Sequence, residues 1–186
     1  MTNIHKFHTM TKRNDIIWLK EVESTNRYAR MNIDRLDNLS VVSAFCQSAG
    51  RGQGDHQWHS SPGENLTFTV ILKEPAIAPI EQSIISDTTA NAVVELLEKH
   101  GIKAWIKPPN DIWVDTKKIC GILIEHSLRA DRISWSIIGI GLNVNQTIFP
   151  DNLPNPTSMA LEGHPADIET ILSEFLDIFR RASWLQ

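Results

Sequence analysis

The sequence predicts an α+β fold in which a mixed, largely antiparallel sheet packs against helices. Three observations support this prediction. Short segments of apolar and alternating residues recur along the chain, and a few longer segments repeat apolar residues at helical spacing. Glycine, proline and polar residues separate these segments, as expected for turns. About seven strand-like and three main helical segments fit one sheet layered against helices.

The first half of the chain contributes three strands and one helix. Residues 16–22 read as a strand, and the Glu-Ser-Thr-Asn run at 23–26 looks like the cap of a helix that continues to Met31. Residues 41–46 form a short apolar strand. In residues 66–72 apolar residues alternate with threonines, which is the period of a strand with two different faces.

A long helix opens the second half. Residues 80–100 carry apolar or small residues at every fourth position, and Gly101 ends the helix. The expected buried stripe consists of Ile80, Ile84, Thr88, Ala92 and Leu96. Strand-like runs follow at 103–106, 112–114, 119–125 and 133–144. A last helix, from Asp167 to about Trp184, carries an apolar stripe made of Ile168, Ile171, Leu172, Phe175 and Phe179.

Length and composition predict one domain. The chain has 186 residues, which suffices for a single core, so we expect a domain over residues 14–186 and a flexible lead-in over 1–13. Hydrophobic residues make up 41% and charged residues 22%, as in ordinary globular proteins. The formal charge of −4 argues against DNA as a partner. Without a signal peptide or an apolar run of about 20 residues, we expect a cytoplasmic protein that does not enter membranes.

A glycine-rich loop precedes the strand at 66–72. Gly50, Gly52 and Gly54 surround Arg51, so free backbone N–H groups and a cation could together bind an anion. A tight connection between strands is the simpler interpretation of the same glycines. Neither a P-loop nor a dinucleotide motif is present, because no Gly-Lys-Ser/Thr follows and Asp55 stands at the third glycine position.

Two further stretches suggest chemistry. Lys107 precedes Pro108 and Pro109, which we expect to hold the chain extended, and Lys118 follows eleven residues later. Two lysines near an Asn-Asp pair could neutralise phosphates, while the amide reads a base and the carboxylate orients a lysine or a metal. A hairpin with solvated lysines is the alternative. In residues 139–145 two glycines interrupt an apolar strand, which weakens it unless a ligand or another backbone comes close.

Taken in order, the motifs at 23–26, 50–66, 107–111, 118–125 and 139–145 resemble the catalytic domain of biotin protein ligases. The family is also called biotin–acetyl-CoA-carboxylase ligases, and the resemblance covers about residues 15–180. It implies the class II synthetase-like fold of biotin ligases. It also implies a two-step reaction: ATP activates biotin to biotinyl-5'-AMP, and a lysine of a biotin carboxyl carrier domain then accepts biotin and releases AMP.

The resemblance assigns site residues to three groups. The catalytic group is Lys118, Arg51 and Lys107. The biotin-binding group is Ser24, Thr25, Asn26, Gln47, Arg51, Gly52, Gln53, Lys118 and Gly121. The nucleotide-binding group is Arg51, Trp58, Lys107, Asn110, Asp111 and Asn143. No protein-held metal is expected, because Mg²⁺ would arrive on the ATP phosphates. Two of these residues keep a simpler alternative: Ser24 as a helix cap and Trp58 as a core residue.

The chain departs from the family pattern in its loop and in its extent. Gln53 stands where many members have arginine, and Asp55 adds a negative charge, so retention of the adenylate is expected to be weaker. Pro108 replaces the usual tryptophan. We expect no N-terminal helix-turn-helix in this chain, and hence no repressor activity. We also expect no C-terminal β domain, which would make the chain a minimal or a truncated form. The partners expected are a carboxyl carrier domain and, through a free strand edge, a second copy.

Two alternatives to a biotin ligase stay open at this stage. A lipoate-type ligase uses the same adenylating logic on a related fold. A non-catalytic module would hold biotin or a nucleotide without turning it over. Biotin-dependent formation of the adenylate distinguishes all three.

Overall fold

A computed structural model describes residues 16–109 and 111–185. The expected lead-in over residues 1–13 and the predicted nucleotide contact Asn110 lie outside the described residues. Seven strands form one sheet in the order β1-β2-β3-β7-β6-β5-β4. β1 and β2 pair in parallel, and every other neighbouring pair is antiparallel. The predicted mixed, largely antiparallel sheet is therefore confirmed.

The elements follow the expected order, with adjusted bounds. The strands are β1 (Ile16–Leu19), β2 (Val41–Ala44), β3 (Leu66–Lys73), β4 (Trp105–Lys107), β5 (Asp111–Val114), β6 (Lys117–Arg129) and β7 (Arg132–Leu142). The helices are α1 (Thr25–Met31), α2 (Ser83–Lys99) and α3 (Ile168–Phe179), with short 3-10 turns at Ile33–Arg35, Pro79–Glu81 and Ser183–Leu185. None of the described helices is long and apolar enough to cross a bilayer.

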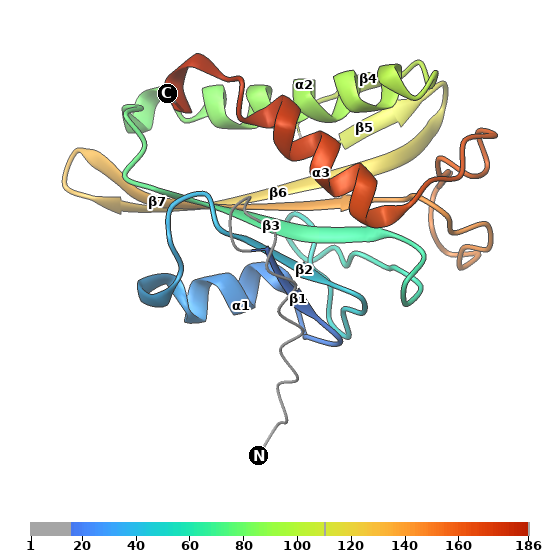
Figure 1. The fold of residues 1–186 in the computed structure, drawn as a ribbon, viewed down its shortest axis with the longest axis horizontal. Coiled ribbons are helices and arrows are strands. Elements are labelled where there is room, and N and C mark those ends of the chain that lie inside the picture. Colours follow the sequence, from blue (N-terminus) through green and yellow to red (C-terminus); the bar gives the residue numbers. More distant parts are fainter. Residues whose placement is uncertain (1–15, 110, 186) are drawn as a thin grey trace.

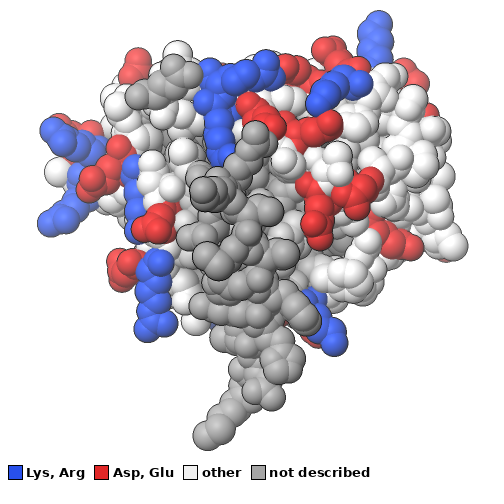
Figure 2. All heavy atoms as spheres, in the orientation of Figure 1, with Lys and Arg blue, Asp and Glu red and all other residues white. Residues whose placement is uncertain are grey.

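The sheet separates two layers of helix. α2 and α3 cover one face, and α1 lies against the other (Figure 1). The larger core fills the space below α2 and α3, where Phe68 of β3 meets Phe175 of α3 edge to face at 5.2 Å between ring centroids. A smaller cluster under α1 consists of Ala29, Leu36, Val42, Ile71 and Ile137. On the surface seen in Figure 2, basic and acidic side chains of the described residues lie side by side.

Two expectations about local structure were wrong. Ile80 is 92% exposed and Ile84 is also exposed, so the buried stripe of α2 does not begin with them. Ala92 and Leu96 of the expected stripe are buried, and the rest of the buried face consists of Ile85, Thr89, Ala90, Val93 and Leu97. A strict four-residue step advances around a helix of 3.6 residues per turn, and it therefore drifts off the buried face.

The second error concerns the prolines. Pro108 and Pro109 do not extend the chain: they lie in the turn between β4 and β5, and the peptide bond between them is cis. A turn is required there because β4 pairs antiparallel with β5 directly across the two prolines, with Lys107 opposite Asp111.

Candidate active site

One cavity of about 430 Å³ collects most of the predicted site residues. It lies on the α1 side of the sheet, between the start of α1, β6, β7 and the loop at residues 47–58, which we call the arginine loop. The predicted residues that line it are Ser24, Thr25, Asn26, Gln47, Arg51, Gly52, Gln53, Trp58, Lys107, Asp111, Lys118 and Gly121. Residues far apart in the sequence meet there, such as Asn26 and Leu123, which are 97 positions apart.

The floor of the cavity is a bare area of sheet. Gly121 of β6 pairs directly with Gly141 of β7, and both leave room for the indole of Trp58. A Cβ on Gly141 would overlap that indole, and one on Gly121 would stand 3.2 Å from it. The glycines inside the apolar strand are thus explained by a close approach, as the sequence suggested. Nε1 of Trp58 is buried without a hydrogen-bond partner.

Asn26 crosses three strands beside this floor. Its side chain lies over Gly139, where any Cβ would overlap it. Nδ2 donates to the carbonyl of Leu123 and to Oε2 of Glu125, both at 3.1 Å, while Oδ1 accepts from the Thr69 hydroxyl at 2.7 Å. Asn26 is only 3% exposed, so these three bonds fix both its position and the orientation of its amide.

The start of α1 is tied to the arginine loop. Val22 and Gln47 form a parallel bridge, and Oε1 of Gln47 accepts from the backbone N–H of Thr25 at 2.7 Å. Ser24 has the extended backbone of an N-cap, but its hydroxyl makes no capping hydrogen bond. The cap interpretation therefore does not account for the Ser24 side chain, which lines the cavity.

A bulge aims Lys118 into the cavity. β5 pairs Ile112 with Cys120 and Trp113 with Lys118, so Ile119 is the extra residue of β6. Ile119 and Cys120 are both fully buried in the core, which leaves Lys118 on the same face as Gly121. The backbone of Lys118 is held on its other side by Asn155 and Thr157.

The ammonium group of Lys118 lies 2.6 Å from Oδ1 of Asp111 and 5.9 Å from the Trp58 ring. Asp111 thus orients the lysine, as one interpretation of the sequence expected. Burial raises the pKa of the neighbouring Cys120 thiol, although the charge of Lys118 acts in the opposite direction. Cys120 is fully buried in the core and does not line the cavity, so we assign it no role in the reaction.

The second lysine rests on an aromatic face. Nζ of Lys107 lies 3.6 Å from the ring centroid of Trp113, which is a cation–π contact. Trp105 packs beside Trp113 at 6.2 Å and donates to the carbonyl of Asp115. Lys107 is thus an exposed residue that lines the cavity, and its ammonium group rests on the Trp113 ring.

The arginine loop is a tight turn that also lines the cavity. The backbone N–H of Gly52 donates to His56, and that of Trp58 donates to Gly50, at 2.8 and 3.0 Å. Gly54 has φ +62°, which favours glycine. The simpler explanation of the glycines is therefore correct for the turn itself. Arg51 nonetheless points across the cavity to Glu125, with 3.4 Å between Nη1 and Oε1.

Asn143 is the predicted residue that the described structure separates from the cavity. It is buried, and its Nδ2 donates to the carbonyl of Thr157 at 2.8 Å, while its Oδ1 has no partner. Three residues near the site were not predicted from the sequence: Trp113 and Gln57 line the cavity, and Glu125 contacts Asn26. The signal for Glu125 was its place at the end of the Lys118 motif.

Among the described residues, no cluster of His, Cys, Asp or Glu is arranged to hold a metal ion.

The chain is similar to biotin ligases in sequence and in structure. The family model described as biotin/lipoate A/B protein ligase family matches residues 18–143. The bifunctional ligase/repressor BirA of Bacillus subtilis is 37% identical over 147 residues, which cover 76% of this chain and 45% of that protein. The biotin–[acetyl-CoA-carboxylase] ligase of Paracoccus denitrificans is 28% identical over 171 residues, with coverage of 88% and 69%.

Among solved structures, the biotin protein ligase of Aquifex aeolicus in complex with biotin and ATP aligns with a TM-score of 0.69 and 28% identity. The alignment covers 90% of this chain and 69% of that one. The chain spans less than half of the length of the Bacillus relative. Since the family model matches well over half of the residues, the chain belongs to the biotin/lipoate A/B protein ligase family.

Proposed function

We propose that this domain is an ATP-dependent biotin–[acetyl-CoA-carboxylase] ligase. The relatives named above are biotin ligases, and the Aquifex aeolicus structure contains biotin and ATP. The observation that carries the proposal is the shared cavity: three cations, Arg51, Lys107 and Lys118, line the same space as the amides and hydroxyls at the start of α1. That arrangement suits a ligand with a neutral polar end and an anionic end.

The polar end suits the ureido ring of biotin. Ser24, Thr25, Asn26 and Gln47 offer hydroxyl and amide groups at one end of the cavity, next to the glycine floor and the Trp58 indole. The ureido ring presents both donors and an acceptor, and the sulfur-containing ring fused to it is apolar, so a polar rim with an aromatic wall fits the pair of rings.

The cations suit the first chemical step. A biotin carboxylate oxygen attacks the α-phosphorus of ATP, the bond from that phosphorus to the β-phosphate oxygen breaks, and pyrophosphate leaves. Two anions must meet for this reaction, so fixed positive charge at the point of contact lowers the barrier. Lys118 is our choice for that point, because Asp111 holds its ammonium group at 2.6 Å. Arg51 and Lys107 would neutralise the phosphates.

Magnesium would be bound mainly by the phosphates. Of the described residues that line the cavity, Asp111 is the one carboxylate, and it is already paired with Lys118. Mg²⁺ prefers oxygen ligands and commonly keeps water and phosphate in its shell, so this donor set fits a metal that arrives with ATP. When bound there, it would reduce the charge of the phosphates.

In the second step the amine of an acceptor lysine attacks the biotinyl carbonyl carbon, and AMP leaves as the new amide forms. We propose a biotin carboxyl carrier domain as the acceptor, and a cytoplasmic location where ATP is available. A homodimer through a free edge of the sheet also belongs to the proposal. Of the nucleotide contacts proposed from the sequence, Trp58 lines the cavity, whereas Asn143 would act from outside it, because its amide bonds to Thr157. Asn110 is proposed as a further nucleotide contact.

The deciding experiment is biotin-dependent exchange of labelled pyrophosphate into ATP. We expect exchange with biotin and Mg²⁺, and none without biotin. Exchange with lipoate in place of biotin would instead identify a lipoate-type ligase. Binding of biotin without any exchange would identify a non-catalytic module, and transfer to a purified carrier domain tests the second step separately.

A further inference from the structure

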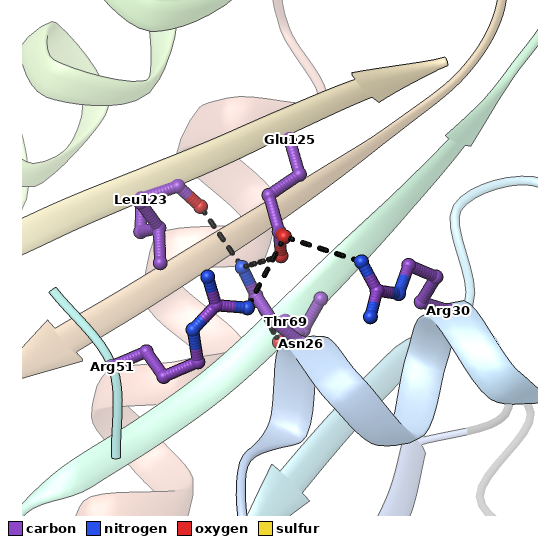
Figure 3. Close-up of polar contacts among 6 residues, drawn as sticks. All are labelled: Asn26, Arg30, Arg51, Thr69, Leu123 and Glu125. Atoms are coloured by element: carbon purple, nitrogen blue, oxygen red, sulfur yellow. Dashed lines mark hydrogen bonds and ion pairs between the residues drawn. The ribbon is translucent and has the colours of Figure 1, made fainter. Parts of the chain in front are cut away.

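Glu125 connects two parts of the site that the reaction uses. It follows Gly121 and Leu123 on the cavity face of β6 and lies opposite Ile137 of β7. Its side chain is 22% exposed. Oε2 accepts from Nδ2 of Asn26 at 3.1 Å, and Oε1 faces Nη1 of Arg51 at 3.4 Å. Oε1 also lies 3.9 Å from Nη1 of Arg30, which approaches from α1 on the side opposite Arg51 (Figure 3).

The first consequence concerns Asn26. Both hydrogens of its amide nitrogen are used, one by Leu123 and one by Glu125, and its oxygen is used by Thr69. Without the carboxylate, a donor on a residue that is 3% exposed would lose one of its two partners. A buried donor without a partner is unfavourable, so the amide would turn or shift over Gly139. Glu125 therefore sets which atoms of Asn26 face the cavity.

The second consequence concerns Arg51. The guanidinium of this cavity-lining residue is paired with a carboxylate of the protein itself. A carboxylate or phosphate of a ligand that binds Arg51 has to compete with Glu125. The pair is weak, because half of the Arg51 side chain is exposed and solvent screens the interaction. Displacement by a ligand anion is therefore feasible.

We propose that Glu125 is a positioning residue with two effects. It fixes Asn26 for the biotin ring, and it restrains Arg51 until the anionic part of the ligand displaces the carboxylate. The proposal rests on the proposed ligase function and assigns a role to a residue that does not line the cavity. Arg30 also faces Oε1 of Glu125, whereas Asn26 donates to Oε2, so removal of the Arg30 side chain leaves the hydrogen bond of Asn26 in place.

Three variants separate the two effects. Glu125→Gln keeps an oxygen that can accept from Asn26 but removes the charge that restrains Arg51. Glu125→Ala removes both. Arg30→Ala is the matched control, because it removes a cation of the same cluster outside the cavity. Biotin affinity is measured by calorimetry without ATP, adenylate release by dissociation of labelled biotinyl-5'-AMP, and folding by thermal unfolding.

For Glu125→Gln we expect biotin affinity within about twofold of the parent and adenylate release slower by about three- to fivefold, the range of an exposed pair. For Glu125→Ala we expect biotin affinity about tenfold weaker and release faster than in Glu125→Gln, because the adenylate carries the same biotin ring. Arg30→Ala should stay within about twofold in both measurements. In an Arg51→Ala background, Glu125→Gln should no longer change release, which isolates the pair.

Equal loss of biotin affinity in Glu125→Gln and Glu125→Ala would overturn the role of Glu125 toward Asn26. Unchanged or faster adenylate release in Glu125→Gln would overturn the restraint of Arg51, and this result decides even if Glu125→Ala fails to fold. A parent protein without biotin-dependent pyrophosphate exchange contradicts the proposed function instead. Normal exchange in the parent with either of the first two results contradicts only the role of Glu125.

Discussion

The two faces of the central strands differ in what they hold. On the face under α2 and α3, alternate residues are large and apolar, and they form one continuous core. On the face under α1, the intervening positions of the same strands carry threonine and glycine, such as Thr69, Gly121 and Gly141. Small and polar residues leave space there, which the arginine loop and the start of α1 surround.

Because side chains alternate between the two faces of a strand, one strand can contribute both to the core and to the cavity. Ile138 and Ile140 of β7 are buried in the core, while Gly139 between them lies under Asn26. Changes on the core face should therefore lower stability, whereas changes on the cavity face should mainly lower binding and reaction.

Phe68→Ala tests the core face. Phe68 is 1% exposed and contacts Phe175 edge to face, so its loss leaves a cavity between β3 and α3. We expect the free energy of unfolding to fall by about 3–5 kcal/mol, measured with urea. Leu128→Ala, at a residue that is 57% exposed, should change it by less than about 0.5 kcal/mol. Similar losses for both variants would mean that α2 and α3 do not pack tightly against the sheet at Phe68.

Lys118→Ala tests the cavity face. Removal of a fixed cation at developing charge should slow biotin-dependent pyrophosphate exchange by about 10²–10³-fold, with stability within about 1 kcal/mol of the parent. Lys117→Ala is the control, because this neighbouring lysine pairs with Glu162 at 3.6 Å and does not line the cavity. Exchange at the normal rate in Lys118→Ala would refute the catalytic assignment.

The sequence was sufficient for the elements whose pattern is local. The alternation in β3 predicted a strand, and the apolar stripe of α3 predicted a helix with its buried face. Gly101 follows the end of α2 as expected, with φ +78°. The stripe of α2 was misplaced, because a four-residue step and the true helical period diverge over a long helix. The turn at Pro108 was missed, because the pairing of β4 with β5 is not a property of the two prolines alone.

The site was predictable where a motif held its residues together, and not where contacts join distant segments. Lys118 and Asp111 belong to recognisable motifs, and they meet at 2.6 Å. Nothing in the local pattern of Glu125 indicates that Asn26 and Arg51 converge on it, since those residues are 99 and 74 positions away. Asn143 belongs to a motif too, yet its amide bonds to Thr157 and not to the cavity.

Gly139→Ala places a methyl group on the cavity face without adding charge. Its Cβ would overlap the Asn26 side chain, so either Asn26 or the strand must shift. We expect biotin affinity to fall at least about tenfold and stability by about 1–3 kcal/mol. Ile138→Val, one residue away on the core face, should lower stability by about 0.5–1.5 kcal/mol and leave biotin affinity unchanged. A variant Gly139→Ala that binds biotin normally would show that Asn26 is not a contact.

The paired change Gln53→Arg and Asp55→Gly asks whether the loop, as well as the sheet, decides how tightly the intermediate is held. Gln53 lines the cavity, and Asp55 is exposed near the tip of the arginine loop. The change adds one positive charge and removes one negative charge beside the proposed phosphate site, which takes the net charge from −4 to −2. Each change is worth less than about 1 kcal/mol in an open loop and somewhat more in one closed over a ligand.

We expect release of biotinyl-5'-AMP to slow by about tenfold, and the difference to shrink in about 1 M salt, where the screening length falls to about 3 Å. Asp87→Asn with Asn91→Arg makes the same change of net charge on α2, across the sheet, and should leave release unchanged. The parent enzyme should accordingly lose activated biotin readily and label nearby lysines more than the double variant does. Equal release rates in the parent and the variant would mean that the side chains of Gln53 and Asp55 do not hold the intermediate. Backbone donors and the strand residues Lys107 and Lys118 would then hold it.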